Sequence, residues 1–158
     1  MSKVIEKLNE MGYTLPAPVK PVASYVPALR VGDLVFTSGN LPIADGKIQY
    51  KGEVGGLCST TEEGAEAARL CTLNALSSIN DLIGGLDKIT QVVKVTGFVK
   101  SAQLFSDQPK VLNGASDFLK ELFGPEIGSH TRSAIGVNEL PLNASVEVEL
   151  IVQVRSDA

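Results

Sequence analysis

The spacing of apolar residues along this sequence predicts an α+β fold, with two helices packed on one face of a single, mostly antiparallel sheet. Apolar residues recur at helical spacing in two long segments, whereas other segments alternate apolar and polar residues as strands do. A chain of 158 residues can bury a core without disulfides or a structural metal. We therefore expect one domain over 1–158, with a helix and a proline-rich arm over 1–18 and the core over 19–154.

The N-terminal part is expected to contain a short helix, an extended arm and a β-hairpin. The segment Ser2–Met11 has apolar residues at helical spacing, and the prolines within Pro16–Pro21 keep the next segment extended. Two strands, Tyr25–Val26 and Leu34–Ser38, are predicted on either side of a turn at Gly32-Asp33.

The first long helix has a clear start and a clear end in the sequence. Thr60 and Glu63 form the pattern of a capping box, and Gly84 follows the last apolar residue of the helical stripe. Cys71 lies on that stripe, so we expect it in the core rather than in a redox role.

A strand, a second helix and two further strands complete the chain. The strand covers Gln91–Lys100, and the helix starts after Asp107 and ends at Gly124. The last two strands, Arg132–Val137 and Ser145–Val154, are predicted to form a second hairpin. On the strand over 91–100, the residues expected to face the helices are Val93, Val95 and Val99, with Val92 and Phe98 on the other face.

The final strand raises the question of what covers the outer face of the sheet. Five apolar residues alternate along it and must face the helices, which leaves Glu147, Glu149 and Ile151 on the opposite side. These carboxylates are either ordinary surface groups or part of a face covered by a second copy of the chain. Ile151 in the same row favours at least partial cover, and hence a homo-oligomer.

Composition excludes several classes of function. The net charge of −4 and the pI near 5.0 argue against nucleic-acid binding. The chain has a single histidine, His130, so a zinc site or a histidine triad has almost nothing to draw on, and we expect no metal. No apolar stretch is long enough to cross a membrane, and the N-terminus lacks targeting features, so we expect a cytoplasmic protein with reduced cysteines.

Arg132 can be interpreted in two ways. It begins a mostly apolar strand and would lie near Glu147 if the last two strands pair antiparallel. It then either forms a structural ion pair, which spacing alone favours, or binds an anion with its planar guanidinium group. The neighbouring His130 is expected to be an exposed loop residue.

Several of these segments together resemble the Rid family of YjgF-type reactive-intermediate deaminases. The resemblance extends from Tyr25 to Val154 and is most specific in the order of Arg132-Ser133, Leu140-Pro141 and Val146-Glu147-Val148-Glu149. The resemblance implies a chorismate-mutase-like fold and a homotrimer with active sites in clefts between subunits. It also implies hydrolysis of 2-imino acids and their enamine tautomers, such as 2-aminoacrylate, to 2-keto acids and ammonia, without a cofactor.

The resemblance also implies roles for individual residues. Arg132 would bind the substrate carboxylate and Glu147 would position or activate water. The remaining substrate contacts would come from Tyr25, Ser38, Gly39, Asn113 and Ala134, with Gly39 and Ala134 acting through their backbone.

The sequence departs from the family pattern at two positions, since Asn40 stands where glutamine is common and Ala134 where many members have cysteine. The stretch between Asn113 and Arg132 is also slightly longer than in short members, and the arm over 1–18 has no counterpart in them. A trimer that binds a keto acid or another small carboxylate without turnover is the alternative function. The charge argues against the endoribonuclease or translation-inhibitor activity attached to some members.

Overall fold

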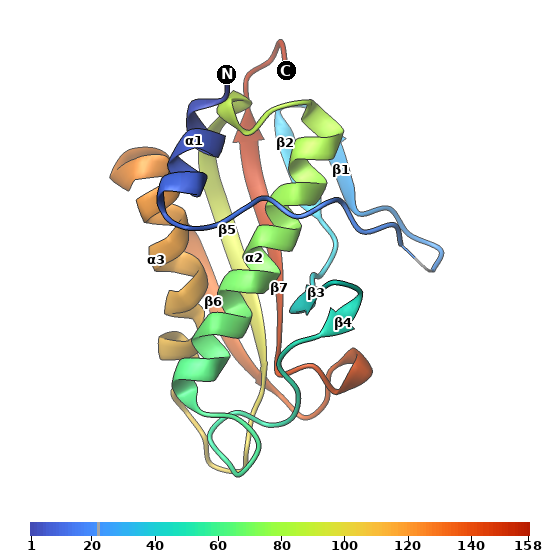
Figure 1. The fold of residues 1–158 in the computed structure, drawn as a ribbon, viewed down its shortest axis with the longest axis vertical. Coiled ribbons are helices and arrows are strands. Elements are labelled where there is room, and N and C mark those ends of the chain that lie inside the picture. The colour runs from blue at the N-terminus through green and yellow to red at the C-terminus, as the bar shows by residue number, and fades with distance from the viewer. Residues whose placement is uncertain (22) are drawn as a thin grey trace.

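A computed structural model describes residues 1–21 and 23–158 of the chain (Figure 1). Three α-helices and seven strands lie in these residues. In chain order the elements are α1 (Lys3–Glu10), β1 (Ala28–Val31), β2 (Leu34–Thr37), β3 (Ile43–Ala44), β4 (Lys47–Ile48), α2 (Thr61–Ile83), the 3-10 turn η1 (Leu86–Lys88), β5 (Ile89–Lys100), α3 (Gln108–Ile127), β6 (Thr131–Val137), the 3-10 turn η2 (Pro141–Asn143) and β7 (Val146–Val154).

The main sheet has the strand order β1-β2-β7-β5-β6, and all its pairs are antiparallel except β5 with β6. Helices α2 and α3 lie side by side across one face of this sheet (Figure 1). Strands β3 and β4 form a separate two-stranded hairpin. The mixed α+β fold with one mostly antiparallel sheet is therefore confirmed, with α1 as a third helix.

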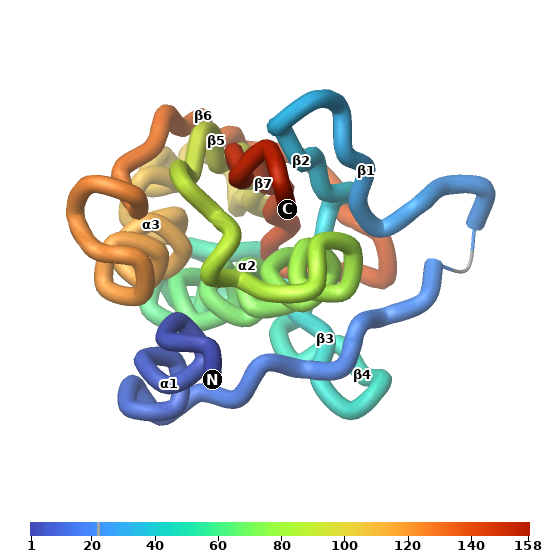
Figure 2. Tube along the Cα trace, turned by 90° about the horizontal axis from the view of Figure 1, so that it is seen from above, coloured from blue at the N-terminus to red at the C-terminus, as the bar shows by residue number. Residues whose placement is uncertain are grey.

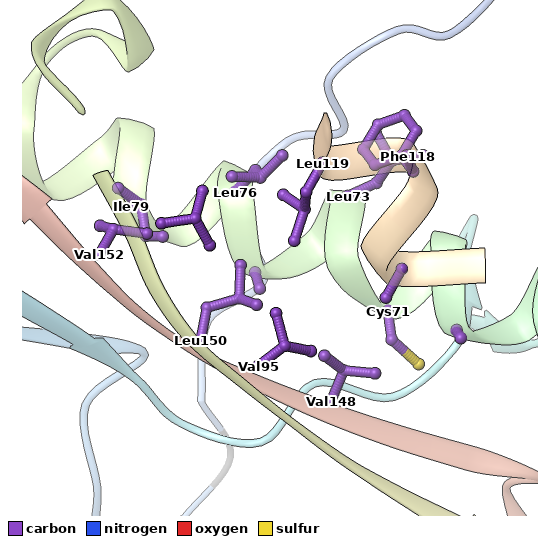
Figure 3. Packing of buried hydrophobic residues seen from close by; sticks show 14 of the residues in the cluster. Cys71, Leu73, Leu76, Ile79, Val95, Phe118, Leu119, Val148, Leu150 and Val152 are labelled. Carbon is purple, nitrogen blue, oxygen red and sulfur yellow. The ribbon is translucent and has the colours of Figure 1, made fainter. Parts of the chain in front are cut away.

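The core forms between the sheet and the two long helices (Figure 3). The capping box of Thr60 and Glu63 starts α2, and Gly84 ends it in the left-handed conformation, as predicted. Cys71 is fully buried in this core, which confirms its structural position. The alternate residues of β7 that were expected to face the helices are also buried, namely Val146, Val148, Leu150, Val152 and Val154.

The predicted hairpin of the last two strands is wrong. Strand β6 pairs in parallel with β5, and β7 lies on the other side of β5 between β5 and β2. The physical reason is the position of α3, which connects β5 to β6 and crosses over the face of the sheet, so the two strands it joins run in the same direction. As a consequence β6 is an edge strand.

Two smaller expectations are also corrected. The first strand begins at Ala28 rather than at Tyr25, although the turn at Gly32-Asp33 is confirmed. In β5 the register shifts between Val92 and Lys94, as in a β-bulge. The shift places Val92 on the helix-covered face, fully buried, whereas the sequence had placed it on the opposite face.

The N-terminal arm is attached along the outside of α2. Leu8 of α1 is fully buried, and the N-terminal backbone of α1 donates hydrogen bonds to the Asp87 carboxylate. The chain then crosses α2 on the side away from the sheet (Figure 2), where the Ser77 hydroxyl donates to the Pro16 carbonyl over 2.6 Å. Among the described residues, none of the helices is both long and apolar enough to cross a membrane.

Candidate functional site

A cavity of about 330 Å³ opens where the end of β2, the outer face of β7 and the N-terminal arm meet. Four of the predicted site residues line it together: Tyr25, Ser38, Gly39 and Glu147. The rest of the wall is largely apolar, with Pro27, Leu41, Ile43 and Leu142 among its members. The cavity therefore combines one carboxylate with an apolar surface, which is the usual composition of a small-molecule site.

Glu147 lies against the backbone of Gly39. A Cβ atom at Gly39 would lie only 2.7 Å from Oε2 of Glu147, so the carboxylate occupies the space that a larger residue would need. The segment is fixed there because Asn40 and Val148 exchange two backbone hydrogen bonds, of 2.8 and 3.0 Å. Glycine at this position thus allows the Glu147 side chain to pack directly against the backbone in the wall of the cavity.

Burial raises the pKa of the Glu147 carboxyl group above its ordinary value, and the nearby Glu149 carboxylate raises the pKa further. Both effects disfavour the charged form. A raised pKa makes the carboxylate a better proton acceptor, which favours a role in general acid–base catalysis.

Ser38 and Tyr25 also line this cavity. The Ser38 hydroxyl donates to the carbonyl of Val26 over 2.6 Å, so its proton is already used and its oxygen remains available as an acceptor. Tyr25 is 51% exposed, as a side chain at an open mouth would be. The Asn40 amide donates to the Ser38 carbonyl and so helps to hold the turn.

Arg132 and Asn113 lie on the other side of the sheet. Arg132 pairs in register with Val95, which in turn pairs with Leu150, and both of these residues face the helices. Glu147 pairs in register with Phe98, which lies on the outer face. The expectation that Arg132 lies near Glu147 within one chain is therefore wrong, because β5 separates their strands and the two side chains leave opposite faces.

Arg132 instead reaches α3. Its Nη1 donates to Oδ1 of Asn113 over 2.8 Å and to the hydroxyl of Ser116 over 3.1 Å. Ala134 follows on the same face of β6, partly buried against the core. The predicted site residues thus fall into two groups, which we call the Glu147 cavity (Tyr25, Ser38, Gly39, Glu147) and the Arg132 group (Asn113, Arg132, Ala134).

Within residues 1–21 and 23–158, no carboxylate lies within ion-pair distance of Arg132. The other three arginines have partners, since Arg30 pairs with Asp33, Arg155 pairs with Asp157, and Arg69 lies 5.0 Å above the ring of Tyr13. The structural ion pair that spacing favoured is therefore not formed, and the guanidinium of Arg132 keeps the capacity to bind an anion.

Sequence reasoning missed two features around these groups. Val19, Lys20 and Pro21, which continue the extended N-terminal arm beyond residue 18, line the Glu147 cavity, although a proline-rich segment carries no motif that would indicate a wall of a site. His130 is half-buried and hydrogen-bonded to Ser116, rather than an exposed loop residue. Its position two residues before Arg132 was the only signal for this contact.

Comparisons with known proteins agree with this fold. The family described as "YjgF/chorismate_mutase-like, putative endoribonuclease" matches residues 6–154. The chain is 38% identical to Protein TCP17 of Trypanosoma cruzi over 154 residues, which cover 98% of this chain and 96% of the relative. It is 30% identical over 138 residues to the 2-iminobutanoate/2-iminopropanoate deaminase of Dermatophagoides farinae, covering 87% and 91% of the two chains.

A solved structure is also similar to this chain in its fold. A protein of unknown function from Agrobacterium tumefaciens superposes with a TM-score of 0.89 at 40% identity, over 96% of this chain and 93% of that protein. The match of the family over nearly the whole chain, together with these relatives, shows that the chain belongs to the YjgF family.

Proposed function

We propose that this protein hydrolyses reactive 2-imino acids and their enamine tautomers to 2-keto acids and ammonia. The observation that carries the proposal is the state of Arg132, whose guanidinium is held by neutral oxygens instead of a carboxylate. Its Nη1 is occupied by Asn113 and Ser116, and in the part of the chain that the structure describes its Nε and Nη2 have no acceptor. That edge can hold a substrate carboxylate with two parallel hydrogen bonds.

A complete site needs Arg132 and Glu147 together, and we propose that two copies of the chain supply them. The outer face of the sheet exposes Leu29, Val31, Phe36 and Ile135, an apolar surface that a second copy would cover. Strand β6, which carries Arg132, lies at the sheet edge and has unpaired backbone groups to offer a neighbour. A homotrimer with sites between subunits would bring the Arg132 group of one copy to the Glu147 cavity of the next.

The proposed reaction uses only the groups of this site. Water adds to the carbon of the protonated imine while Glu147 accepts one proton from that water. Glu147 returns the proton to the nitrogen of the resulting carbinolamine, the carbon–nitrogen bond breaks, and its electron pair leaves on ammonia. The hydroxyl group then gives its proton to the departing ammonia, which leaves as ammonium, as the keto-acid carbonyl forms. The raised pKa of Glu147 suits both transfers.

Two further points support this proposal. The relative from Dermatophagoides farinae carries the name of an imine deaminase at 30% identity. The net charge of −4 weakens the case for the endoribonuclease activity in the family description, because RNA binding depends on phosphate neutralisation by cations.

Subunit complementation tests the proposal sharply. Arg132→Ala and Glu147→Gln should each abolish ammonia release from enzymatically generated 2-aminoacrylate or 2-iminobutanoate. When the two variants are co-expressed and assemble at random, about one subunit boundary in four combines an intact Arg132 with an intact Glu147, so about one quarter of wild-type activity should return.

The outcomes separate the alternatives. No recovery in mixed oligomers, with each variant inactive alone, would contradict a site shared between subunits. Arg132-dependent binding of pyruvate or 2-oxobutanoate by a wild-type protein that releases no ammonia would instead identify a small-carboxylate binding protein. Full activity of Arg132→Ala would overturn the proposed carboxylate site.

A further inference from the structure

The single histidine of the sequence, His130, is connected to Arg132 by two consecutive hydrogen bonds that meet at Ser116. Nδ1 of His130 lies 2.7 Å from the carbonyl oxygen of Gly128, and Nε2 lies 2.8 Å from the hydroxyl oxygen of Ser116. Ser116 is 5% exposed and also accepts a hydrogen bond from Nη1 of Arg132. The proposed reaction does not use His130, so its place in this chain needs a separate explanation.

The chemistry of the partners fixes where each proton lies. A carbonyl oxygen only accepts, so Nδ1 of His130 must carry the proton that it donates to Gly128. In a neutral imidazole Nε2 is then an acceptor, and it takes the single hydroxyl proton of Ser116. The lone pairs of the Ser116 oxygen are thereby directed toward Nη1 of Arg132.

Both hydrogens of Nη1 are used in this arrangement, one by Ser116 and one by Asn113. The guanidinium is planar, so holding Nη1 at two points fixes the direction of the Nε and Nη2 edge. Orientation of this kind matters because a carboxylate that binds side-on needs both N–H groups aligned with its two oxygens.

We propose that His130 is a positioning residue, which as the neutral Nδ1–H tautomer orients the Ser116 hydroxyl and thereby presents Arg132 to the substrate carboxylate. The inference rests on the proposed role of Arg132 as the carboxylate receptor. It adds a residue that never touches the substrate and acts only through Ser116.

The surroundings of His130 favour the neutral ring. Burial lowers the pKa of the imidazole below its ordinary value, although the Gly128 carbonyl acts in the opposite direction. The charged groups that face it are Lys120 of α3 and Arg132 of β6, and both cations lower the pKa further. Burial and both cations thus favour the uncharged ring, which is the form that the hydrogen bonds to Gly128 and Ser116 require.

Nuclear magnetic resonance of the imidazole nitrogens tests the tautomer directly, and a single histidine makes the assignment unambiguous. We expect one pyrrole-type signal from Nδ1 and one pyridine-type signal from Nε2 at pH 7, in the wild-type protein. An Nε2–H tautomer, or a ring that is protonated at this pH, would overturn the inference whatever the variants do.

Variants then test the connection to Arg132 through binding of pyruvate or 2-oxobutanoate, which needs no turnover. His130→Ala and Ser116→Ala should each weaken binding about tenfold, the size expected for one hydrogen bond to a charged group. The double variant should bind the keto acid no more weakly than Ser116→Ala alone, since both changes interrupt the same series of hydrogen bonds from His130 through Ser116 to Arg132. His130→Gln, whose amide oxygen can accept from Ser116, should restore most of the affinity.

These measurements distinguish the inference from the proposed function. If Arg132→Ala loses keto-acid binding while His130→Ala and Ser116→Ala bind as the wild type does, the positioning role fails and the carboxylate site stands. If Arg132→Ala binds normally, the carboxylate site itself fails. Additive losses in the double variant would show that the two residues act independently and would also refute the positioning role.

Discussion

Adding one methyl group at Gly39 should separate the proposed catalytic role of Glu147 from the stability of the fold. In Gly39→Ala the new Cβ would lie 2.7 Å from Oε2 of Glu147, whereas ordinary contact begins at 3.4 Å. The carboxylate must therefore move by about 0.7 Å or rotate away. Because the obstacle is the end of a flexible side chain rather than backbone, the chain itself can stay in place.

The expected cost is in the rate rather than in folding. A displacement of about 1 Å in a catalytic group can cost about 100-fold, so we expect kcat for imine hydrolysis to fall roughly 10- to 50-fold. The methyl group also restricts the unfolded chain, which offsets part of the strain, so Tm should change by no more than about 3 °C. Binding of 2-oxobutanoate should change little, because the proposed carboxylate receptor is Arg132 and not Glu147.

A matched control is available at Gly56. Alanine there would also displace a glutamate side chain, that of Glu53, but neither residue lines the Glu147 cavity. Gly56→Ala should therefore keep wild-type kcat in the coupled ammonia assay. Wild-type kcat in Gly39→Ala, or an equal fall in both variants, would show that the position of Glu147 against Gly39 does not matter for the reaction.

Two further predictions concern stability. Because the pKa of Glu147 is raised in the folded state, its contribution favours folding below its ordinary pKa and is lost as the pH rises through the folded value. Glu147→Gln should therefore raise Tm at pH 7 and lose this advantage near pH 4, and a constant Tm difference across that range would contradict the assigned shift. Gly114→Ala should cost about 1–3 kcal/mol in urea unfolding, since its Cβ would meet the Ala65 carbonyl where α3 crosses α2 and backbone cannot move aside easily. Asp117→Ala, at an exposed position of the same helix, should change the unfolding free energy by less than about 0.5 kcal/mol, and equal costs would show that this contact is loose.

Local patterns in the sequence determined the elements and the core. The capping box at Thr60, the end of α2 at Gly84 and the alternation along β7 depend on neighbours three or four residues away in a helix, or two away in a strand. The burial of Cys71 followed from the same periodicity. Interactions of this range are visible in the sequence because the chain itself sets the distances.

Long-range pairing was decided only by the tertiary structure. Nothing local distinguishes a β6 that pairs with β7 from a β6 that pairs in parallel with β5, since both leave the same alternation of residues. That pairing decides on which side of the sheet Arg132 lies relative to Glu147. The shift at Val92 is likewise visible only in the pairing of β5 with β7, where Val92 and Lys94 lie opposite the consecutive residues Val152 and Ile151.

For the candidate site, the resemblance seen in the sequence led to the proposed roles of Arg132 and Glu147, whereas spacing alone favoured a structural ion pair for Arg132. Only the tertiary structure divided them between the two faces of the sheet, enclosed Glu147 with the N-terminal arm, and linked His130 through Ser116 to Arg132. The physical reason is that side-chain chemistry belongs to each residue, whereas orientation, burial and hydrogen-bond partners arise from segments that are distant in the chain and meet only when it folds.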